Sequence, residues 1–288
     1  MKKIFTLLFL TLFFFGSFTE SNAKKWQRKA STEVPFTIFK SNKALNQNTA
    51  EVIASGDFFY GISHRFKGAV STGYEEFFGL DGGANMRTLI GYGFTNNFMA
   101  TIGRTSQGKQ YDLELKYKLF ASEKLALPLI ISINVGTAVT SLKYGEFATQ
   151  PDGDSRRMQY FASLIFNTII FDHLAIGLSP SFLYNSVISS IDPKNSITLG
   201  SYLQYFIGDD MTSVILEANN TFSGFRGDGR NKFYDSYALG VELETGGHFF
   251  KFYFGNNTSL NQSQYLLGSV KEMTLDNTVF GFQITRNF

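Results

Sequence analysis

Residues 111–119 have the sequence YDLELKYKL, in which apolar or aromatic side chains alternate strictly with charged ones. Successive side chains of an extended strand point to opposite faces, so one face carries Tyr and Leu and the other carries only charges. The charged residues are Asp112, Glu114, Lys116 and Lys118. Such a strand suits the wall of a membrane β-barrel, where lipid lies outside and a polar lumen lies inside.

Segments with the same two-residue period recur along the chain. We predict about 12 strands, at roughly residues 51–66, 84–95, 97–106, 109–120, 126–140, 155–168, 173–186, 195–207, 211–222, 233–246, 248–259 and 274–288. Five predicted connections are short and contain Asn, Asp, Ser or Gly, whereas most of the others are long. Short turns on one rim and long loops on the other are typical of an outer-membrane barrel with both termini in the periplasm. A soluble β-sandwich, the main alternative, gives no reason for this sorting of loops.

The expected fold class is therefore all-β, an antiparallel up-and-down transmembrane β-barrel with short periplasmic turns and longer extracellular loops. We assign this barrel domain to residues 49–288. The last strand carries Phe280, Phe282 and Ile284 on one face, and the chain stops at Phe288. A terminal aromatic residue after such a strand resembles the signal that the outer-membrane assembly machinery reads, so we predict that role for Phe288.

The amino terminus is typical of a cleaved secretory signal peptide. Lys2 and Lys3 precede an apolar run at residues 4–18, and small residues lie at positions −3 and −1 relative to cleavage after Ala23. We therefore predict that residues 1–23 are a signal peptide and that the protein is exported to the cell outer membrane.

Composition excludes several classes of function. The chain has 288 residues, no cysteine, a formal net charge of +2 and 16% aromatic residues. The lack of cysteine excludes disulfides, thiolate catalysis and cysteine-based metal sites. A charge close to zero argues against nucleic acid as a partner, because binding to it needs a clustered basic surface. The expected partners are outer-membrane lipid, the assembly machinery and a small solute of unknown identity, and no cofactor is expected.

Several short stretches resemble an uncharacterised family of bacterial outer-membrane β-barrel proteins, classified only as a domain of unknown function. They are GISHRF at residues 61–66, FGLD at 78–81, NMR at 85–87, YGFT at 92–95, GR at 103–104 and KYKL at 116–119. Family members usually have glycine directly after His-Arg-Phe, whereas Lys67 intervenes before Gly68 here. The resemblance implies a β-barrel at the outer membrane. It implies no activity, because the family has no established catalytic residues.

Alternation places a set of charged side chains on the inner face of the predicted barrel. The candidate lumen-lining residues are Asp57, Arg65, Arg87, Asp112, Glu114, Lys116, Lys118, Arg157, Glu217, Glu242 and Lys251. A pore selective for anions or cations would carry a ring of one sign, but both signs occur here in comparable number. Twelve strands about 4.8 Å apart and tilted by about 40° give a barrel roughly 24 Å across, narrower than general porins of roughly 16–18 strands. We therefore predict a narrow lumen of mixed charge.

No arrangement of residues indicates catalysis. Ser63 and His64 are adjacent in a predicted strand, so their side chains point to opposite faces and form a poor dyad. The three histidines are scattered without metal-ligand spacing. Asp152, Asp154 and Asp228 could supply oxygens to a Ca²⁺ ion, but solvated loop charges explain them more simply.

We therefore expect a non-enzymatic barrel that passes or binds a small solute. Two other functions remain open. One is an outer-membrane enzyme that acts on lipid, as a hydrolase or acyltransferase. The other is a structural or surface-interaction barrel whose long loops meet a partner.

Residues 24–48 precede the first predicted strand and allow two interpretations. They could form a periplasmic tail, the usual fate of an unpaired terminus, or a plug inside the lumen. The apolar stretch VPFTIF at residues 34–39 and the wall carboxylates Glu114, Glu217 and Glu242 favour a plug, since the carboxylates could pair with basic residues near the only tryptophan, Trp26. We prefer the tail, because charge pairs in a wet lumen contribute only about 0–1 kcal/mol each.

Overall fold

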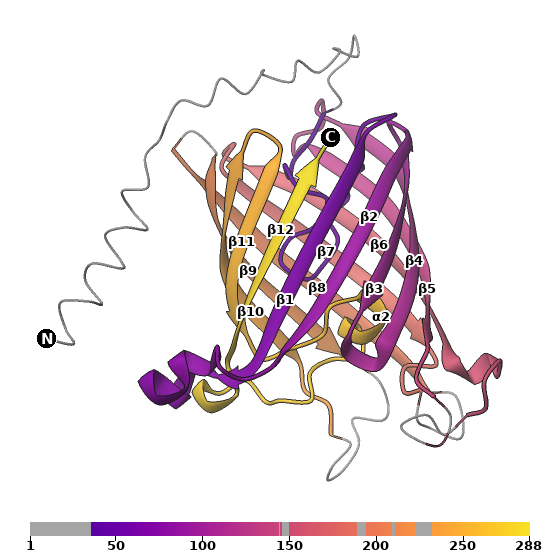
Figure 1. The fold of residues 1–288 in the computed structure, drawn as a ribbon. Coiled ribbons are helices and arrows are strands. Elements are labelled where there is room, and N and C mark those ends of the chain that lie inside the picture. The colour runs from indigo at the N-terminus through magenta and orange to yellow at the C-terminus, as the bar shows by residue number, and fades with distance from the viewer. Residues whose placement is uncertain (1–35, 144, 146–149, 189–193, 209–210, 223–231) are drawn as a thin grey trace, which may run out of the picture. The chain divides into compact units, whose positions relative to one another are not determined.

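The computed structural model describes residues 36–288, except residues 144, 146–149, 189–193, 209–210 and 223–231. Twelve antiparallel strands close into a barrel in which each strand pairs with its neighbours in the chain and the last pairs with the first (Figure 1). The strands are β1 (Phe58–Ala69), β2 (Ala84–Thr95), β3 (Phe98–Thr105), β4 (Gln110–Ser122), β5 (Leu129–Thr140), β6 (Met158–Ile170), β7 (Leu174–Tyr184), β8 (Asn195–Ile207), β9 (Thr212–Thr221), β10 (Ser236–Thr245), β11 (His248–Gly255) and β12 (Val279–Asn287). The predicted fold class is confirmed.

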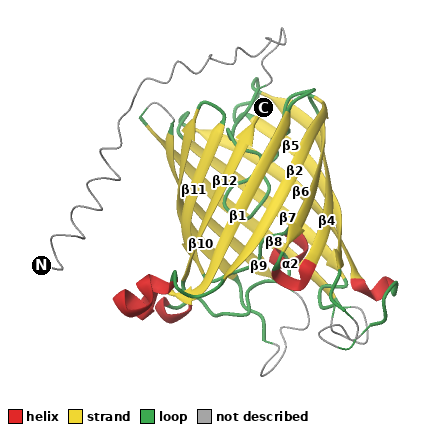
Figure 2. Ribbon diagram, viewed as in Figure 1, coloured by secondary structure: helices red, strands yellow, loops and turns green. Residues whose placement is uncertain are grey.

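The two rims of the barrel differ in the length of their connections. Figure 2 shows short turns and the carboxyl terminus at one rim, which we call the turn rim, and longer loops with short helices at the other, the loop rim. At the turn rim, residues 96–97 join β2 to β3 and residues 246–247 join β10 to β11. Gly246 and Gly247 both have positive φ, a conformation that favours glycine in two-residue hairpin turns. The predicted sorting of short turns and long loops is confirmed.

Side chains on each strand alternate between lipid and interior as the sequence predicts. On β4, Tyr111 and Tyr117 are exposed on the outer wall, whereas Asp112 and Lys116 are buried inside. The outer wall near β1 and β12 carries a cluster of stacked or tilted aromatic rings. These rings belong to Phe66, Phe252, Phe254, Phe280 and Phe282. Alternation on β4 therefore separates a lipid-facing surface from a charged interior face.

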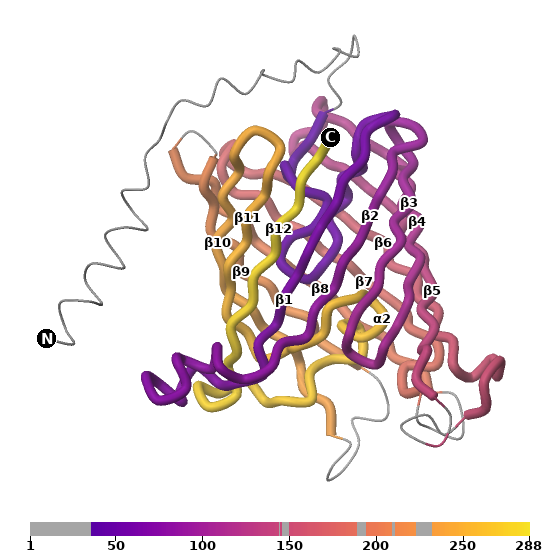
Figure 3. Tube along the Cα trace, viewed as in Figure 1, coloured from indigo at the N-terminus to yellow at the C-terminus, as the bar shows by residue number. Residues whose placement is uncertain are grey.

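The start of the barrel differs from the prediction. The first strand begins at Phe58 rather than near residue 51, and the chain before it lies inside the barrel (Figure 3). Most residues between 38 and 53 are buried. The preferred interpretation of this segment as a periplasmic tail is therefore wrong for residues 36–48. The remaining part, residues 24–35, and the predicted signal peptide lie outside the described residues.

The last long loop also turns inward, from the loop rim. Residues 256–269, which join β11 to β12, are almost all buried and include the short helix α2 (Gln262–Tyr265). Asn261 caps this helix, since its side chain accepts a hydrogen bond from the backbone N–H of Gln264 at 2.9 Å. We call residues 256–269 the infolded loop. Within the described part of the chain, no helix has both the length and the apolar character needed to cross a bilayer.

Candidate functional site

The lumen is the candidate site, and a hairpin from the amino-terminal side fills it. Lys43 and Asn48 form an isolated antiparallel bridge, and the backbone N–H of Ala44 donates to the carbonyl of Gln47 at 2.8 Å. We call residues 36–54 the lumenal hairpin and residues 44–47 its tip. After the hairpin, the chain reaches the turn rim, where the side chain of Asn96 accepts from the backbone N–H of Ser55 at 3.0 Å.

One carboxylate of the barrel wall holds the tip. Glu217, on β9, accepts hydrogen bonds from the backbone N–H groups of Leu45, Asn46 and Gln47 at 3.1, 2.8 and 3.0 Å. The side-chain amide of Asn46 adds a fourth bond, at 2.8 Å. Successive backbone N–H groups that converge in this way form a favourable site for an anionic oxygen. Glu217 therefore compensates for its own complete burial by binding the tip.

Two lysines of the wall bind the backbone carbonyls of the hairpin. Lys116, on β4, donates to the carbonyl oxygens of Asn42, Thr49 and Glu51 at 2.9, 2.8 and 3.0 Å. Lys251, on β11, donates to the carbonyls of Lys43 and Ala44. Each ammonium group has three donors, so Lys116 is fully satisfied by the hairpin backbone. Lysines that would otherwise repel one another in a narrow lumen thus hold the hairpin in place.

Amide and hydroxyl side chains of the wall add further contacts. The carbonyl of Ala50 accepts from Ser132 Oγ at 2.6 Å, and the carbonyl of Asn48 accepts from the hydroxyl of Tyr202 at 3.1 Å. The side chain of Asn167 accepts from the backbone N–H of Ala50. Ser132, Tyr202 and Asn167 are not among the predicted lumen-lining residues. Strand alternation predicts that their side chains face the interior. It does not indicate that they bind the hairpin, because the hairpin is distant from them in the sequence.

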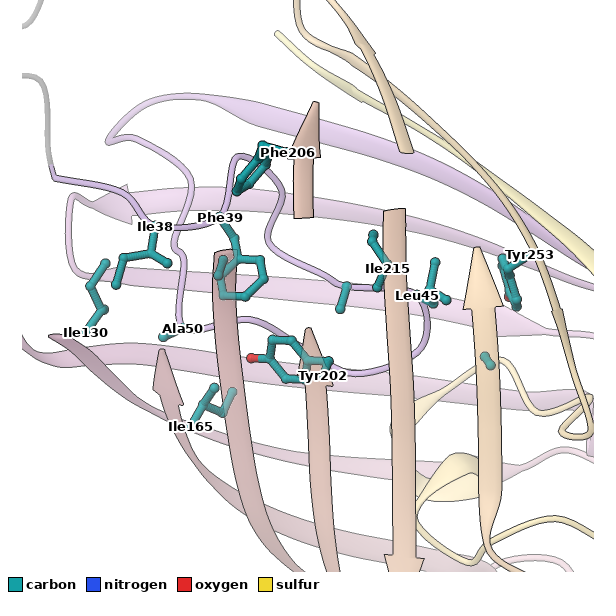
Figure 4. Packing of buried hydrophobic residues seen from close by; sticks show 13 residues of the cluster. Ile38, Phe39, Leu45, Ala50, Ile130, Ile165, Tyr202, Phe206, Ile215 and Tyr253 are labelled. Atoms are coloured by element: carbon teal, nitrogen blue, oxygen red, sulfur yellow. The ribbon is translucent and has the colours of Figure 1, made fainter. Parts of the chain in front are cut away.

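An apolar cluster completes the packing of the hairpin (Figure 4). Ile38, Phe39, Leu45 and Ala50 of the hairpin lie among apolar and aromatic side chains of the wall. Those wall residues include Ile130, Ile165, Tyr202, Phe206, Ile215 and Tyr253. The rings of Phe39 and Tyr202 meet edge to face, with centroids 5.2 Å apart. Residues 34–39 are the apolar stretch that favoured a plug. Of the described residues 36–39, Ile38 and Phe39 are buried inside the barrel.

A second charged group lies on the opposite side of the lumen. Arg87, on β2, forms ion pairs with Asp112 and Glu114 on β4, and its distance to Glu114 is 3.0 Å. Glu114 also accepts from the side-chain amide of Asn48 at 2.8 Å, so this group reaches the hairpin as well. Glu242 pairs with Lys251 at 2.7 Å. Each of the three wall carboxylates therefore has a partner among the described residues, whereas the basic residues near Trp26 that were proposed as partners lie outside them.

The hairpin and the infolded loop meet inside the barrel. Gln262, in α2, donates through its side chain to the carbonyl of Asn46 at 2.7 Å. The hydroxyl of Tyr265 donates to Glu217 at 2.8 Å. Two segments that enter from opposite rims thus bind the same wall carboxylate, Glu217.

The predicted lumenal residues fall into two groups. Nine project from strands and are buried inside the barrel: Arg65, Arg87, Asp112, Glu114, Lys116, Lys118, Glu217, Glu242 and Lys251. Asp57 instead precedes β1 at the turn rim and is half-buried. Arg157 is buried at the loop rim, at the end of a short 3-10 helix, where it pairs with Asp152. Asp57 and Arg157 therefore lie at the two rims rather than along the barrel wall.

The loop carboxylates considered as calcium ligands have arginine partners. Asp152 binds Arg157, and Asp154 accepts from the guanidinium of Arg156 at 2.6 Å. Hydrogen bonds from the side chain and backbone of Arg156 lower the pKa of Asp154 to about 2. Asp228 lies outside the described residues. Among the residues that the structure describes, no group of three or more His, Asp, Glu or Cys side chains could hold a metal ion.

The adjacent residues Ser63 and His64 do not form a dyad. Ser63 is buried inside the barrel beside Gln283, whereas His64 lies on the outer wall and stacks on Phe282 with ring centroids 4.7 Å apart. The two side chains therefore face different environments, as their parity predicts.

A cavity of about 310 Å³ opens at the loop rim, next to the infolded loop. Its described lining combines aliphatic side chains with several amides and hydroxyls, and none of these residues is Asp, Glu, Lys or Arg. The lining amides belong to Gln107, Gln110, Gln150, Gln159, Asn257 and Gln264. Deeper in the barrel, a space of only about 30 Å³ remains between the hairpin and the wall, enough for about one water molecule.

A search of solved structures found several to which this chain is similar. The NanC porin superposes with a TM-score of 0.49 at 10% identity, over 81% of this chain and 98% of that chain. The KdgM porin gives a TM-score of 0.45 at 11% identity, over 81% and 99% of the two chains. An outer-membrane channel from Pseudomonas putida F1 gives 0.47 at 12% identity, over 83% and 98%. A search of curated proteins found no match.

The match to a protein family is more extensive. Residues 39–288 match the family described as a membrane bound beta barrel domain, DUF5777. The matched region includes all twelve strands and most of the lumenal hairpin. The chain therefore belongs to the DUF5777 family of membrane-bound β-barrels.

Proposed function

We propose that this protein is a non-enzymatic, gated channel of the outer membrane for a small, uncharged solute, and that the lumenal hairpin is its gate. The observation that carries the proposal is the position of the hairpin across the lumen, between Glu217 on one wall and Lys116 on another. A passage through the barrel requires this segment to move.

The path of the hairpin makes such movement feasible. The chain before the tip contacts the turn rim through Lys40, which pairs with Glu244 at 3.2 Å near the end of β10. The chain after the tip reaches the same rim at Ser55. Because both arms approach one rim, the hairpin can withdraw as a unit without any described residue having to thread through the barrel.

The contacts that hold the hairpin are compatible with reversible release. Many are hydrogen bonds between wall side chains and the hairpin backbone, and each contributes a net ~0.5–1.5 kcal/mol, or ~1.5–3 kcal/mol where the side chain is charged, because water replaces it after release. The wall left behind would carry Glu217, Lys116, Lys118 and Lys251, so an emptied lumen would fill with water. If the hairpin and the wall formed only a permanent core, we would expect apolar side chains at these four positions.

The class of solute follows from the cavity at the loop rim. Its volume of about 310 Å³ lies at the lower end of the range for small-molecule sites, and its amide and aliphatic lining suits an uncharged molecule. A charged solute would lose hydration there without meeting an opposite charge among the described lining residues. The cavity would be the first binding position for a solute that enters from the loop rim.

Conductance in planar bilayers tests the gate. We expect the unaltered protein to be closed most of the time, Glu217→Gln to open more often, and deletion of residues 36–54 to give a steady conductance. The matched control is Glu242→Gln, which changes the same charge in the wall but removes no hydrogen bond to the hairpin, since Glu242 contacts Gln204 and Lys251. Glu242→Gln should open less often than Glu217→Gln.

Swelling of proteoliposomes tests the solute. Liposomes with the deletion variant should swell in glucose and much less in an equal osmolarity of sodium gluconate. Heat-modifiable migration on gels shows whether the deletion variant is a folded barrel. A folded deletion variant that passes neither ions nor glucose would contradict the proposal and favour a structural barrel.

A further inference from the structure

The first and last long loops form a joint structure outside the barrel. The 3-10 segment η1 (Val70–Gly79) follows β1 and contacts the 3-10 turn η5 (Leu275–Asn277), which precedes β12. The backbone N–H of Val70 donates to the carbonyl of Thr278 at 2.8 Å. Figure 1 shows η1 and the chain around η5 projecting sideways beyond the barrel wall at the loop rim. We call residues 70–80 together with residues 270–277 the lateral platform.

The lateral platform exposes many large apolar side chains. Tyr74 is 86% exposed and Leu275 is 84% exposed. Phe77, Phe78 and Met273 are also among the exposed large hydrophobic residues, whereas the exposed Val270 borders the cavity at the loop rim. The same segments also expose Glu75, Glu76, Glu272 and Asp276. Large apolar side chains gathered on one exposed element mark an interaction site for protein or membrane.

The backbone of the platform is specialised. Phe77 and Phe78 have φ of +46° and +56°, a left-handed conformation that bulky residues rarely adopt. At the base of the loop, a Cβ atom on Gly68 would lie 2.5 Å from the carbonyl oxygen of Gly79, so two glycines are required for the close approach. The stretch FGLD, which resembles the family pattern, and Gly68 thus lie at this platform and its base rather than in the lumen.

The surface beneath the platform is the lipid-facing wall. Phe66 lies two residues before Gly68, and its ring stacks on Phe280 with centroids 5.9 Å apart. Phe280 in turn contacts Phe254 on the same outer wall, with centroids 5.5 Å apart. The aromatic rings of the lipid-facing wall therefore reach to within two residues of Gly68, at the base of the platform.

We propose that the lateral platform lies on the membrane at the loop rim and inserts its aromatic side chains into the interfacial region of that leaflet. A segment that extends sideways from the rim of a membrane barrel covers lipid and not the lumen. Aromatic residues favour the interface between acyl chains and headgroups, where apolar rings and polar groups are both accommodated. The lipid surface is the partner favoured over a second copy of the chain, because the base of the platform adjoins the lipid-facing wall at Phe66 and the platform projects sideways beyond that wall. This inference goes beyond the proposed channel function and does not depend on whether the lumen opens.

Tryptophan fluorescence in bilayers tests the inference. The chain has one tryptophan, Trp26, so Trp26→Phe gives a background without indole. Phe78→Trp and, separately, Tyr74→Trp are introduced into it, and the folded barrels are reconstituted with phosphatidylcholine brominated either near the headgroup or near the chain end. Ser155→Trp, at an exposed loop-rim position outside the platform, is the matched control.

We expect blue-shifted emission from the platform tryptophans, with stronger quenching by the shallow bromines than by the deep ones and protection from aqueous acrylamide. The control should emit at longer wavelength and be quenched by acrylamide alone. Platform tryptophans that behave like the control would overturn the inference. So would a blue shift that depends on the protein-to-lipid ratio and resists both bromines, because that result indicates contact with a second copy. The Tyr74 variant decides the result if Phe78→Trp disturbs the left-handed backbone.

Discussion

The carboxylate of Glu217 accepts hydrogen bonds from both the backbone N–H and the side-chain amide of Asn46, each at 2.8 Å. The two residues are 171 positions apart, one in the wall of the barrel and the other at the tip of the lumenal hairpin. This contact fixes the depth of the hairpin in the lumen. The infolded loop contacts the same carboxylate, because the hydroxyl of Tyr265 donates a hydrogen bond to Glu217.

Replacement of Glu217 should loosen the tip of the hairpin. Glu217→Ala leaves several buried N–H groups without an acceptor, which costs about 1–3 kcal/mol for such a group, and Glu217→Gln should cost less because it retains one acceptor oxygen. Hydrogen exchange of the amides of Leu45, Asn46 and Gln47 in the folded barrel measures the effect. Glu244→Gln is the control, since Glu244 pairs with Lys40 away from the tip. Unchanged exchange at the tip in Glu217→Ala would show that the carboxylate does not hold it.

Gly177 provides space for a ring that supports the hairpin. A Cβ atom at this position would lie 2.0 Å from the ring of Tyr202, whose hydroxyl donates to the carbonyl of Asn48. Gly177→Ala should therefore destabilise the folded barrel by about 1–3 kcal/mol through overpacking. Urea unfolding in lipid vesicles measures the change. Gly83→Ala, where a Cβ atom would meet nothing within 4 Å, should have little effect, and equal losses in both variants would exclude the steric explanation.

Leu115 and Lys116 are neighbours on β4 with opposite environments. Leu115 faces the outer wall, so Leu115→Arg should cost roughly 2–4 kcal/mol if the site lies near the middle of the bilayer. Lys116→Leu should instead release the hairpin backbone. Thiol reagents in water can reach position 116 only when the hairpin is absent, because Lys116 is 4% exposed and lies against the hairpin. Lys116→Cys should react only after deletion of residues 36–54, and Leu115→Cys should remain unreactive in both backgrounds. Labelling of Leu115→Cys alone would reverse the assigned faces.

Phe288 closes the seam between the first and last strands. Its backbone N–H donates to the carbonyl of Phe58 at 2.8 Å, and the guanidinium of Arg286 lies 4.7 Å from the centre of its ring. Deletion of Phe288 should slow assembly, because it removes seam hydrogen bonds together with the predicted assembly signal. The rate at which the heat-modifiable form appears during assembly measures this effect. Phe288→Tyr should assemble normally, and an unchanged rate in the deletion variant would remove Phe288 from the assembly signal.

The sequence predicts the wall of this barrel well for a physical reason. Whether Asp112 faces the lumen and Tyr111 faces lipid depends on the two-residue period of a single strand, which is written locally in the chain. Turn positions such as residues 246–247 are local in the same way, because they depend on the backbone freedom of glycine. The fold class and the nine buried strand charges follow from these local patterns.

The content of the lumen could not be predicted in the same way. The first strand is predicted from about residue 51, but Glu51 lies in the lumen, where its carbonyl accepts a hydrogen bond from Lys116 of β4. The sequence-based argument for a plug considered only charge pairs between wall carboxylates and basic residues. In the structure, Glu217 instead accepts hydrogen bonds from backbone N–H groups of the hairpin, and Lys116 and Lys251 donate to its backbone carbonyls. Backbone groups are the same in every sequence, so such contacts leave no signature.

Cysteine accessibility at Ala50 tests the central claim, that residues 36–54 lie fixed inside the barrel, most directly. The chain has no cysteine of its own, and Ala50 is fully buried whereas Ser55, just beyond the hairpin, is exposed. In the folded barrel in lipid, Ala50→Cys should resist a water-soluble maleimide that labels Ser55→Cys rapidly, and both should react after unfolding in urea. Labelling of Ala50→Cys in the folded barrel as fast as Ser55→Cys would show that the segment is a tail in water and would contradict the account of a filled, gated lumen.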